Sequence, residues 1–144
     1  MFATSKARRT PERLHVLIVD DEESVRRFVE RVMREAGHET GMASDGAEAL
    51  KMAPTFGRID LLLTDVNMPE MVGHELAKRV RATQPEVKVL YLTGYADLLF
   101  KEKMTLSSGE AFLDKPCSVK GLLEAVSLLA YGSLKDRPLA GSVR

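Results

Sequence analysis

Five residues with acidic, hydroxyl or amino side chains stand at or just after the ends of predicted strands. They are Asp20, Asp21, Asp65, Thr93 and Lys115. An Asp or Thr at such a position is compatible with a purely structural role, because both residues commonly cap the next helix. In an open parallel sheet, however, the carboxyl ends of the strands meet at one edge, where ligands bind. We therefore expect three carboxylates, a hydroxyl and an ammonium to lie together.

Three carboxylates in one place repel one another unless a cation lies among them. Hard oxygen ligands that leave room for water suit Mg²⁺, which binds few carboxylates and keeps part of its hydration shell. The sequence therefore predicts a Mg²⁺ site at Asp20, Asp21 and Asp65, with Mn²⁺ as the alternative ion.

Alternating strand-like and helix-like patterns predict the elements that carry these residues. Short apolar runs rich in β-branched residues predict strands at 15–20, 39–43, 59–65, 87–92 and 111–113. Apolar residues at helical spacing predict helices near 25–36, 44–52, 74–82, 96–106 and 118–130. Strands joined through helices are parallel, with helices on both faces. The predicted fold is α/β, a (βα)5 doubly wound parallel five-stranded sheet.

Length and charge predict one domain between two basic tails. The chain has 144 residues, of which 44% are hydrophobic and 29% charged, and this fits a single core. We expect the domain to span 14–134, between a disordered N-terminal tail (1–13) and a flexible C-terminal tail (135–144). The tails carry seven basic and two acidic side chains, which leaves 19 acidic against 14 basic groups in the domain.

Composition also excludes several classes of protein. The 21 basic and 21 acidic residues cancel, whereas a nucleic-acid binder has a basic excess. The apolar runs are far too short to cross a bilayer, so we expect no membrane association. Cys117 is the single cysteine, which fits a reducing, cytoplasmic location. We interpret it as a small hydrophobic residue rather than a redox thiol.

Four segments together carry a family resemblance. They are Val19-Asp-Asp-Glu22, Asp65-Val-Asn-Met-Pro-Glu-Met-Val-Gly73, Leu92-Thr-Gly-Tyr-Ala96 and Phe112-Leu-Asp-Lys-Pro116. In this order and on these elements, they resemble the motifs of the receiver (response regulator) domain of two-component signalling. The match covers about 14–134, and the chain is similar to a stand-alone, chemotaxis-type receiver. The resemblance implies a flavodoxin-like sheet of order 2-1-3-4-5 and a phosphoacceptor role in phosphorelay signal transduction.

The resemblance also implies a role for each residue of the acidic pocket. Asp65 would be the phosphoryl acceptor. Asp21 and Asp65 would bind Mg²⁺ directly, Asp20 would act mainly through water, and Asn67 would offer its backbone carbonyl to the metal. Lys115 would pair with the phosphoryl group.

Two further residues would form the switch. By the resemblance, Thr93 would hydrogen-bond the phosphoryl group and Phe112 would swing inward when Thr93 moves. The chain departs from the family here, because Phe112 lacks the hydroxyl that a Tyr would supply and Cys117 stands where receivers often have Phe. The fourth helix, near 97–104, is also unusually apolar. These departures concern the switching surface and leave the acceptor unaffected.

The remaining expectations concern access and lifetime. Gly94 is small and would leave the site open to a docking kinase. The Lys115-Pro116 bond is a candidate cis peptide that would aim the lysine inward. Asn67 and Tyr95 would flank the route of the attacking water and set the lifetime of the phosphorylated state.

The implied partners are a sensor histidine kinase or a histidine phosphotransfer protein, and a downstream protein target. The target would bind a face made of the fourth helix, the fifth strand and the fifth helix. We expect no enzymatic activity beyond self-phosphorylation from a phosphodonor and slow autodephosphorylation.

Other functions remain open at this point. A haloacid-dehalogenase-like phosphohydrolase also uses a strand-end aspartate and Mg²⁺, but it needs a second Asp two residues later, where this chain has Asn67. It also needs a cap insertion, which is absent. A receiver without its own output, acting as a phosphate sink or shuttle, fits the same residues. A nucleotide-binding domain is disfavoured because no Gly-rich loop follows the first strand.

Overall fold

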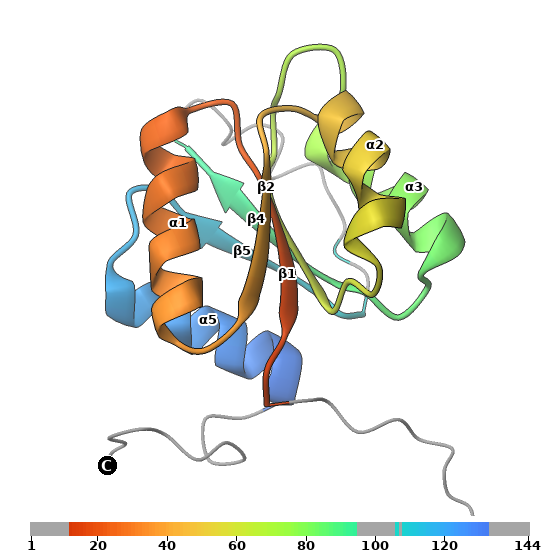
Figure 1. Cartoon of the computed structure of the whole chain (residues 1–144). Coiled ribbons are helices and arrows are strands. Elements are labelled where there is room, and N and C mark those ends of the chain that lie inside the picture. The colour runs from red at the N-terminus through yellow and green to blue at the C-terminus, as the bar shows by residue number, and fades with distance from the viewer. Residues whose placement is uncertain (1–11, 95–105, 107, 133–144) are drawn as a thin grey trace, which may run out of the picture.

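The computed structural model describes residues 12–94, 106 and 108–132. Its core is a parallel sheet between layers of helices (Figure 1). The strands lie in the order β2-β1-β3-β4-β5. The strands are β1 (His15–Val19), β2 (Glu39–Ala43), β3 (Leu61–Asp65), β4 (Lys88–Thr93) and β5 (Glu110–Asp114). The described helices are α1 (Glu23–Glu35), α2 (Gly46–Phe56), α3 (Gly73–Thr83) and α5 (Val119–Tyr131). The predicted α/β fold and strand order are confirmed.

Several predictions fall on residues that the structure does not describe. The predicted fourth helix lies almost entirely outside the described residues, as do Tyr95 and most of both tails. Among the described residues, no helix is long and apolar enough to cross a membrane.

The central strands are buried along their whole length. β3 is buried at every position, and β1 and β4 are buried at every position but their first residue. The edge strands β2 and β5 expose more of their residues. A strand covered by helices on both faces has no polar side, which explains why the central strands are near-continuous apolar runs in the sequence.

Side chains of successive strand residues point to opposite faces and fill two cores. Leu17 and Val19 of β1 pack in the core covered by α2 and α3. Val16 and Ile18 pack in the other core, covered by α1 and α5. Figure 1 shows these two helix layers on either side of the sheet. Held on both faces, the sheet is a rigid platform for the loops at its carboxyl edge.

The strand register aligns the ends that matter for function. Thr64 of β3 lies beside Val19 of β1, and Thr93 of β4 lies beside Asp114 of β5. β1 ends at Val19, one residue earlier than predicted, so that Asp20 begins the following loop. Asp65 of β3 lies beside Leu92 of β4, so the carboxyl ends of β1, β3, β4 and β5 lie at one edge of the sheet.

Candidate functional site

Three carboxylates meet at the carboxyl edge of the sheet, as the sequence predicts. One carboxylate oxygen from each of Asp20, Asp21 and Asp65 lies within 4.8 Å of the other two. Asp20 is fully buried and Asp65 is 5% exposed, whereas Asp21 is exposed. The cluster is thus walled by protein on one side and open on the side of Asp21, where a ligand can enter.

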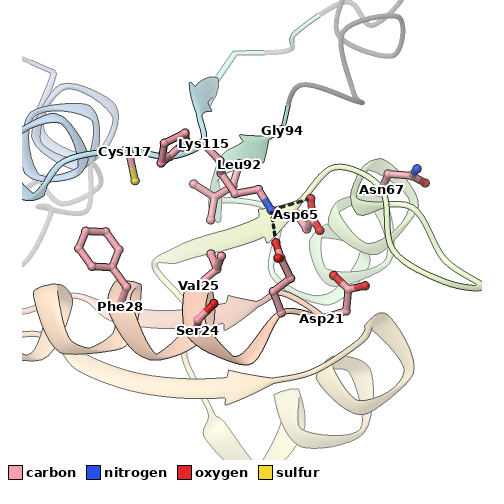
Figure 2. Close-up of a pocket in the computed structure, with 12 residues that line it drawn as sticks. Asp21, Ser24, Val25, Phe28, Asp65, Asn67, Leu92, Gly94, Lys115 and Cys117 are labelled. Carbon is pink, nitrogen blue, oxygen red and sulfur yellow. Dashed lines mark ion pairs between the residues drawn. The ribbon is translucent and has the colours of Figure 1, made fainter.

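Lys115 is the cation of this cluster. Its Nζ lies 3.2 Å from Asp20 Oδ2. It also lies 3.5 Å from Asp65 Oδ1 (Figure 2) and 3.6 Å from Glu22 Oε1. Burial alone would lower the pKa of Lys115, but the charges of Asp20 and Asp65 outweigh it and the pKa is raised. Lys115 therefore carries a full positive charge at neutral pH beside the predicted acceptor.

Asp20 anchors the first loop as well as facing the cluster. Burial raises the pKa of its carboxyl, against the hydrogen bond that Glu22 N donates to Oδ1 (2.9 Å) and the charge of Lys115. Arg26 Nη1 donates to the backbone carbonyl of Asp20 at 2.7 Å. The loop is therefore fixed from the start of α1, and a buried carboxylate is held where a bound cation would neutralise it.

The loop after β3 folds back on the acceptor. Gly73 N donates to Val66 O at 2.8 Å, and a Cβ on Gly73 would lie 2.2 Å from the backbone oxygen of Asp65. Only glycine fits this close approach. Asn67, two residues after Asp65, is exposed and is one of the residues that line a pocket beside the cluster.

Thr93 has a partner that sequence reasoning missed. Its Oγ1 donates to Asp114 Oδ1 at 2.8 Å, and the residue is 2% exposed. Lys115 N donates to Thr93 O at 2.7 Å, and the Lys115-Pro116 peptide bond is cis. Asp114 was missed because the predicted fifth strand ended at residue 113, whereas β5 runs to Asp114 and pairs it with Thr93.

Phe112 lies away from the acidic cluster. Its half-buried side chain packs on the α2 and α3 side of the sheet, with its ring centroid 5.7 Å from that of Tyr91. It lies on the same face as Thr93, two residues along the adjacent strand. Tyr95, expected together with Asn67 to set the lifetime of the phosphorylated state, lies outside the described residues.

A pocket of about 700 Å³ opens over the cluster. Asp65, Asn67, Gly94 and Lys115 line one part of it, and the other part is lined by Val25, Phe28, Leu92, Pro116 and Cys117 (Figure 2). Helical spacing assigned Val25 and Phe28 to the core, and both do pack against it. Spacing along one helix does not reveal which core residues also border a loop at the sheet edge.

The donor set suits a hard divalent cation. Three carboxylates and one ammonium leave the cluster with a surplus of negative charge, which a bound cation would balance. All three offer oxygen ligands, and the exposed side at Asp21 leaves room for water in the coordination shell. The residues present therefore fit a metal that keeps part of its hydration.

Comparison with known proteins identifies the family. The model of the response regulator receiver domain matches residues 16–127, most of the chain, and the chain belongs to this family. It is 37% identical to the sensor kinase CckA of Brucella abortus over 112 residues, which are 77% of this chain and 12% of CckA. It therefore spans only a small part of that kinase.

Two solved structures are similar over nearly their whole length. The chemotaxis protein CheY4 of Vibrio cholerae aligns with a TM-score of 0.72 and 34% identity, over 81% of this chain and 98% of CheY4. The response regulator protein TrrA of Thermotoga maritima, in complex with Mg²⁺-BeF, aligns with a TM-score of 0.69 and 29% identity, over 81% and 98%. This chain is thus a receiver domain of two-component systems, and it has an acidic cluster able to bind a metal.

Proposed function

We propose that this receiver accepts a phosphoryl group on Asp65 from the phosphohistidine of a sensor histidine kinase or a histidine phosphotransfer protein. One observation carries the proposal: the nearly buried carboxylate of Asp65 lies 3.5 Å from Lys115 Nζ and within the acidic cluster. A nucleophile, a fixed cation and a place for a second cation are what phosphoryl transfer needs from a protein.

In the proposed step, a carboxylate oxygen of Asp65 attacks phosphorus and the bond from phosphorus to the donor's imidazole nitrogen breaks. The electron pair leaves with the imidazole, and an aspartyl phosphate forms. Lys115 pairs with the carboxylate of Asp65 and would neutralise charge on the phosphoryl oxygens. Asp20, Asp21, Asp65 and the carbonyl of Asn67 would hold Mg²⁺, which balances phosphoryl charge when bound; Mn²⁺ is the alternative ion.

The hydrogen bond between Thr93 and Asp114 supplies a route to the output. On phosphorylation, the Thr93 hydroxyl would leave Asp114 and donate to a phosphoryl oxygen instead. Phe112, whose half-buried ring already packs against Tyr91 on the same face, would move further inward. A downstream protein would then sense the changed surface of β5, α5 and the predicted fourth helix. In α5, Val119 and Leu128 are 50% and 52% exposed.

We further propose that the protein works in the cytoplasm and is not a turnover enzyme. Asn67 stands where a phosphohydrolase of the haloacid-dehalogenase type needs a general acid, and an amide does not transfer protons at neutral pH. Slow hydrolysis of the aspartyl phosphate is the single hydrolytic reaction expected. Sustained turnover of a phosphate ester would contradict this view.

The test is direct phosphorylation. Incubation with Mg²⁺ and acetyl phosphate should add one phosphate, seen by intact mass, that is lost in base and mapped to Asp65. Asp65→Asn should not be labelled. Asp114→Asn, which retains Asp65, should still be labelled. Labelling of Asp65→Asn to the wild-type extent would refute the assignment. Phosphotransfer from purified histidine kinases then identifies the natural donor.

A further inference from the structure

The pocket over the acidic cluster is larger than a phosphoryl group and a metal ion need. Its volume of about 700 Å³ is in the range of pockets that hold small organic ligands, roughly 300–1,000 Å³. Figure 2 shows the acidic groups and Lys115 at one end, with Phe28 and Cys117 at the other end. The pocket therefore has a charged part and an apolar part.

The apolar part, which we call the apolar wall, consists of Val25, Phe28, Leu92, Pro116 and Cys117. Val25 and Phe28 lie three residues apart on α1, which places them on one helix face. Leu92 is fully buried in β4, next to Thr93. Burial raises the pKa of the Cys117 thiol, so this side chain is neutral at physiological pH. Three separate elements thus supply one uncharged surface beside the acceptor.

We propose that the apolar wall binds the organic group of a small phosphodonor, and that this receiver therefore accepts phosphoryl groups from aromatic acyl phosphates in preference to acetyl phosphate. The proposal depends on the proposed function, because Asp65 must be the acceptor. Complementarity selects this occupant: a phosphoryl anion suits Lys115 and a bound cation, and an aromatic ring suits Phe28 and Val25. No part of a free phosphate ion would use the wall.

The reaction is balanced without a further reactant. A carboxylate oxygen of Asp65 attacks phosphorus, and the bond between phosphorus and the donor's carboxylate oxygen breaks. The electron pair leaves with the aromatic carboxylate, so no proton is needed. The wall touches the organic group both before and during transfer, so it acts mainly through binding and lowers the donor concentration needed for half-maximal rate.

The first test compares two donors in matched variants. Rates of Asp65 phosphorylation by benzoyl phosphate and by acetyl phosphate give a selectivity ratio for each protein. In Phe28→Ala this ratio should fall by about tenfold, the effect of losing some tens of Å² of apolar contact. The intrinsic reactivities of the two donors cancel, because the same pair is compared in every variant.

The control is Phe56→Ala, on α2. Phe56 is also a half-buried aromatic residue, but it packs against His15 and Gly41 and does not line the pocket. Its loss should leave the selectivity ratio unchanged, even if stability falls. If Phe28→Ala does not fold, Val25→Thr makes the wall polar with little change in volume and should lower the ratio in the same direction.

The second test measures binding without any reaction. In the presence of Mg²⁺, phenylphosphonate should shift the methyl NMR signals of Val25 and Leu92 and saturate at lower concentration than methylphosphonate. Equal selectivity ratios in wild type and Phe28→Ala, or no shift at these methyl signals, would overturn the proposal. A protein phosphodonor would then be the remaining candidate to contact the apolar wall. Neither result touches the proposed function, which fails if acetyl phosphate does not label Asp65 or if it labels Asp65→Asn to the wild-type extent.

Discussion

A polar cluster lies at each end of the parallel strands, and the two clusters differ in their balance of charge. At the amino end, Arg81 Nη1 pairs with Glu110 Oε2, whose side chain is 3% exposed, and Tyr91 Oη lies 3.5 Å from the same oxygen. Two further nitrogens of Arg81, Nε and Nη2, donate to Val87 O. One cation meets one carboxylate there, and the remaining donors have backbone partners.

At the carboxyl end, Lys115 faces Asp20, Asp65 and the more exposed Glu22, with Asp21 close by. Negative charge is in surplus among these residues. A balanced buried pair serves folding alone, whereas a surplus is unfavourable until a ligand corrects it. The difference indicates which cluster is built for a ligand, independently of any family resemblance.

The largest expected effect comes from removing the cation of the carboxyl-end cluster. Lys115→Met should slow phosphorylation of Asp65 by acetyl phosphate by about 100-fold or more, because charge stabilisation in the transition state is lost. The measurement is the labelling rate at saturating Mg²⁺. Arg81→Met removes the cation of the other cluster and should leave the rate within about twofold of wild type. Comparable losses in both variants would contradict the distinction.

The amino-end cluster should instead dominate stability. Arg81→Met should lower the free energy of unfolding by about 3 kcal/mol, because the buried carboxylate of Glu110 loses its cationic partner. Denaturant unfolding in EDTA measures this change. The double variant Arg81→Met/Glu110→Leu also removes the Glu110 carboxylate and should recover most of the lost free energy of unfolding. A single variant as stable as wild type would show that the pair contributes little.

The sequence predicted the acidic site better than it predicted the amino-end cluster, for a physical reason. Parallel strands must end at one edge, so Asp20, Asp65 and Lys115 were brought together by topology alone. Arg81 and Glu110 are 29 residues apart and belong to a helix end and a strand start. No periodicity specifies that contact, which depends on the rotamer of one long side chain.

The contact between Thr93 and Asp114 marks the limit of the same topological argument. Edge strand β5 is short and only partly buried, so its apolar pattern is weak and its end was placed one residue too early. The search for polar residues after the predicted strand ends therefore selected Lys115 and missed Asp114. The size of the pocket was likewise unpredictable, because Phe28 reads as an ordinary core residue of α1.

Mg²⁺ should stabilise the protein through the carboxyl-end cluster alone. At a Mg²⁺ concentration about 100 times the dissociation constant of the metal complex, binding should add about 2.7 kcal/mol to the free energy of unfolding. Asp21→Asn removes one ligand and one like charge, so most of this increment should vanish while the metal-free protein is no less stable. Glu110→Gln should keep the whole increment despite its lower stability. Denaturant unfolding across a Mg²⁺ titration decides between these outcomes.

Alkaline pH should weaken both clusters of the metal-free protein. The pKa of Lys115 is raised above its ordinary 10.5, against the lowering effect of burial, by Asp20 and Asp65, and burial raises that of Tyr91 above its ordinary 10.0. The folded chain then holds protons that the unfolded chain has released. Stability should fall as pH rises through this range, with a limiting slope of about 1.4 kcal/mol per pH unit for each group.

The two contributions to this alkaline slope can be separated by substitution. Tyr91→Phe should remove the part of the slope that comes from the amino-end cluster. Lys115→Met should remove the part that comes from the carboxyl-end cluster. Stability is measured by urea unfolding at several pH values in EDTA. A slope unchanged in both variants would show that neither group keeps its proton more tightly in the folded state.

The smallest expected effect concerns backbone strain, which also differs between the two ends. In the loop after β3, beside the acidic cluster, Glu70 has φ of 69°, whereas Gly109, at the amino end of β5, has φ of 81°. A side chain in this left-handed region costs about 1 kcal/mol, which glycine avoids. Glu70→Gly should therefore raise the free energy of unfolding by up to about 1 kcal/mol. The greater conformational entropy of glycine in the unfolded chain opposes this gain and makes it smaller. Gly109→Ala should lower it. Urea unfolding of both variants measures these two changes. A Glu70→Gly variant less stable than wild type would show that contacts of the Glu70 side chain outweigh the backbone strain.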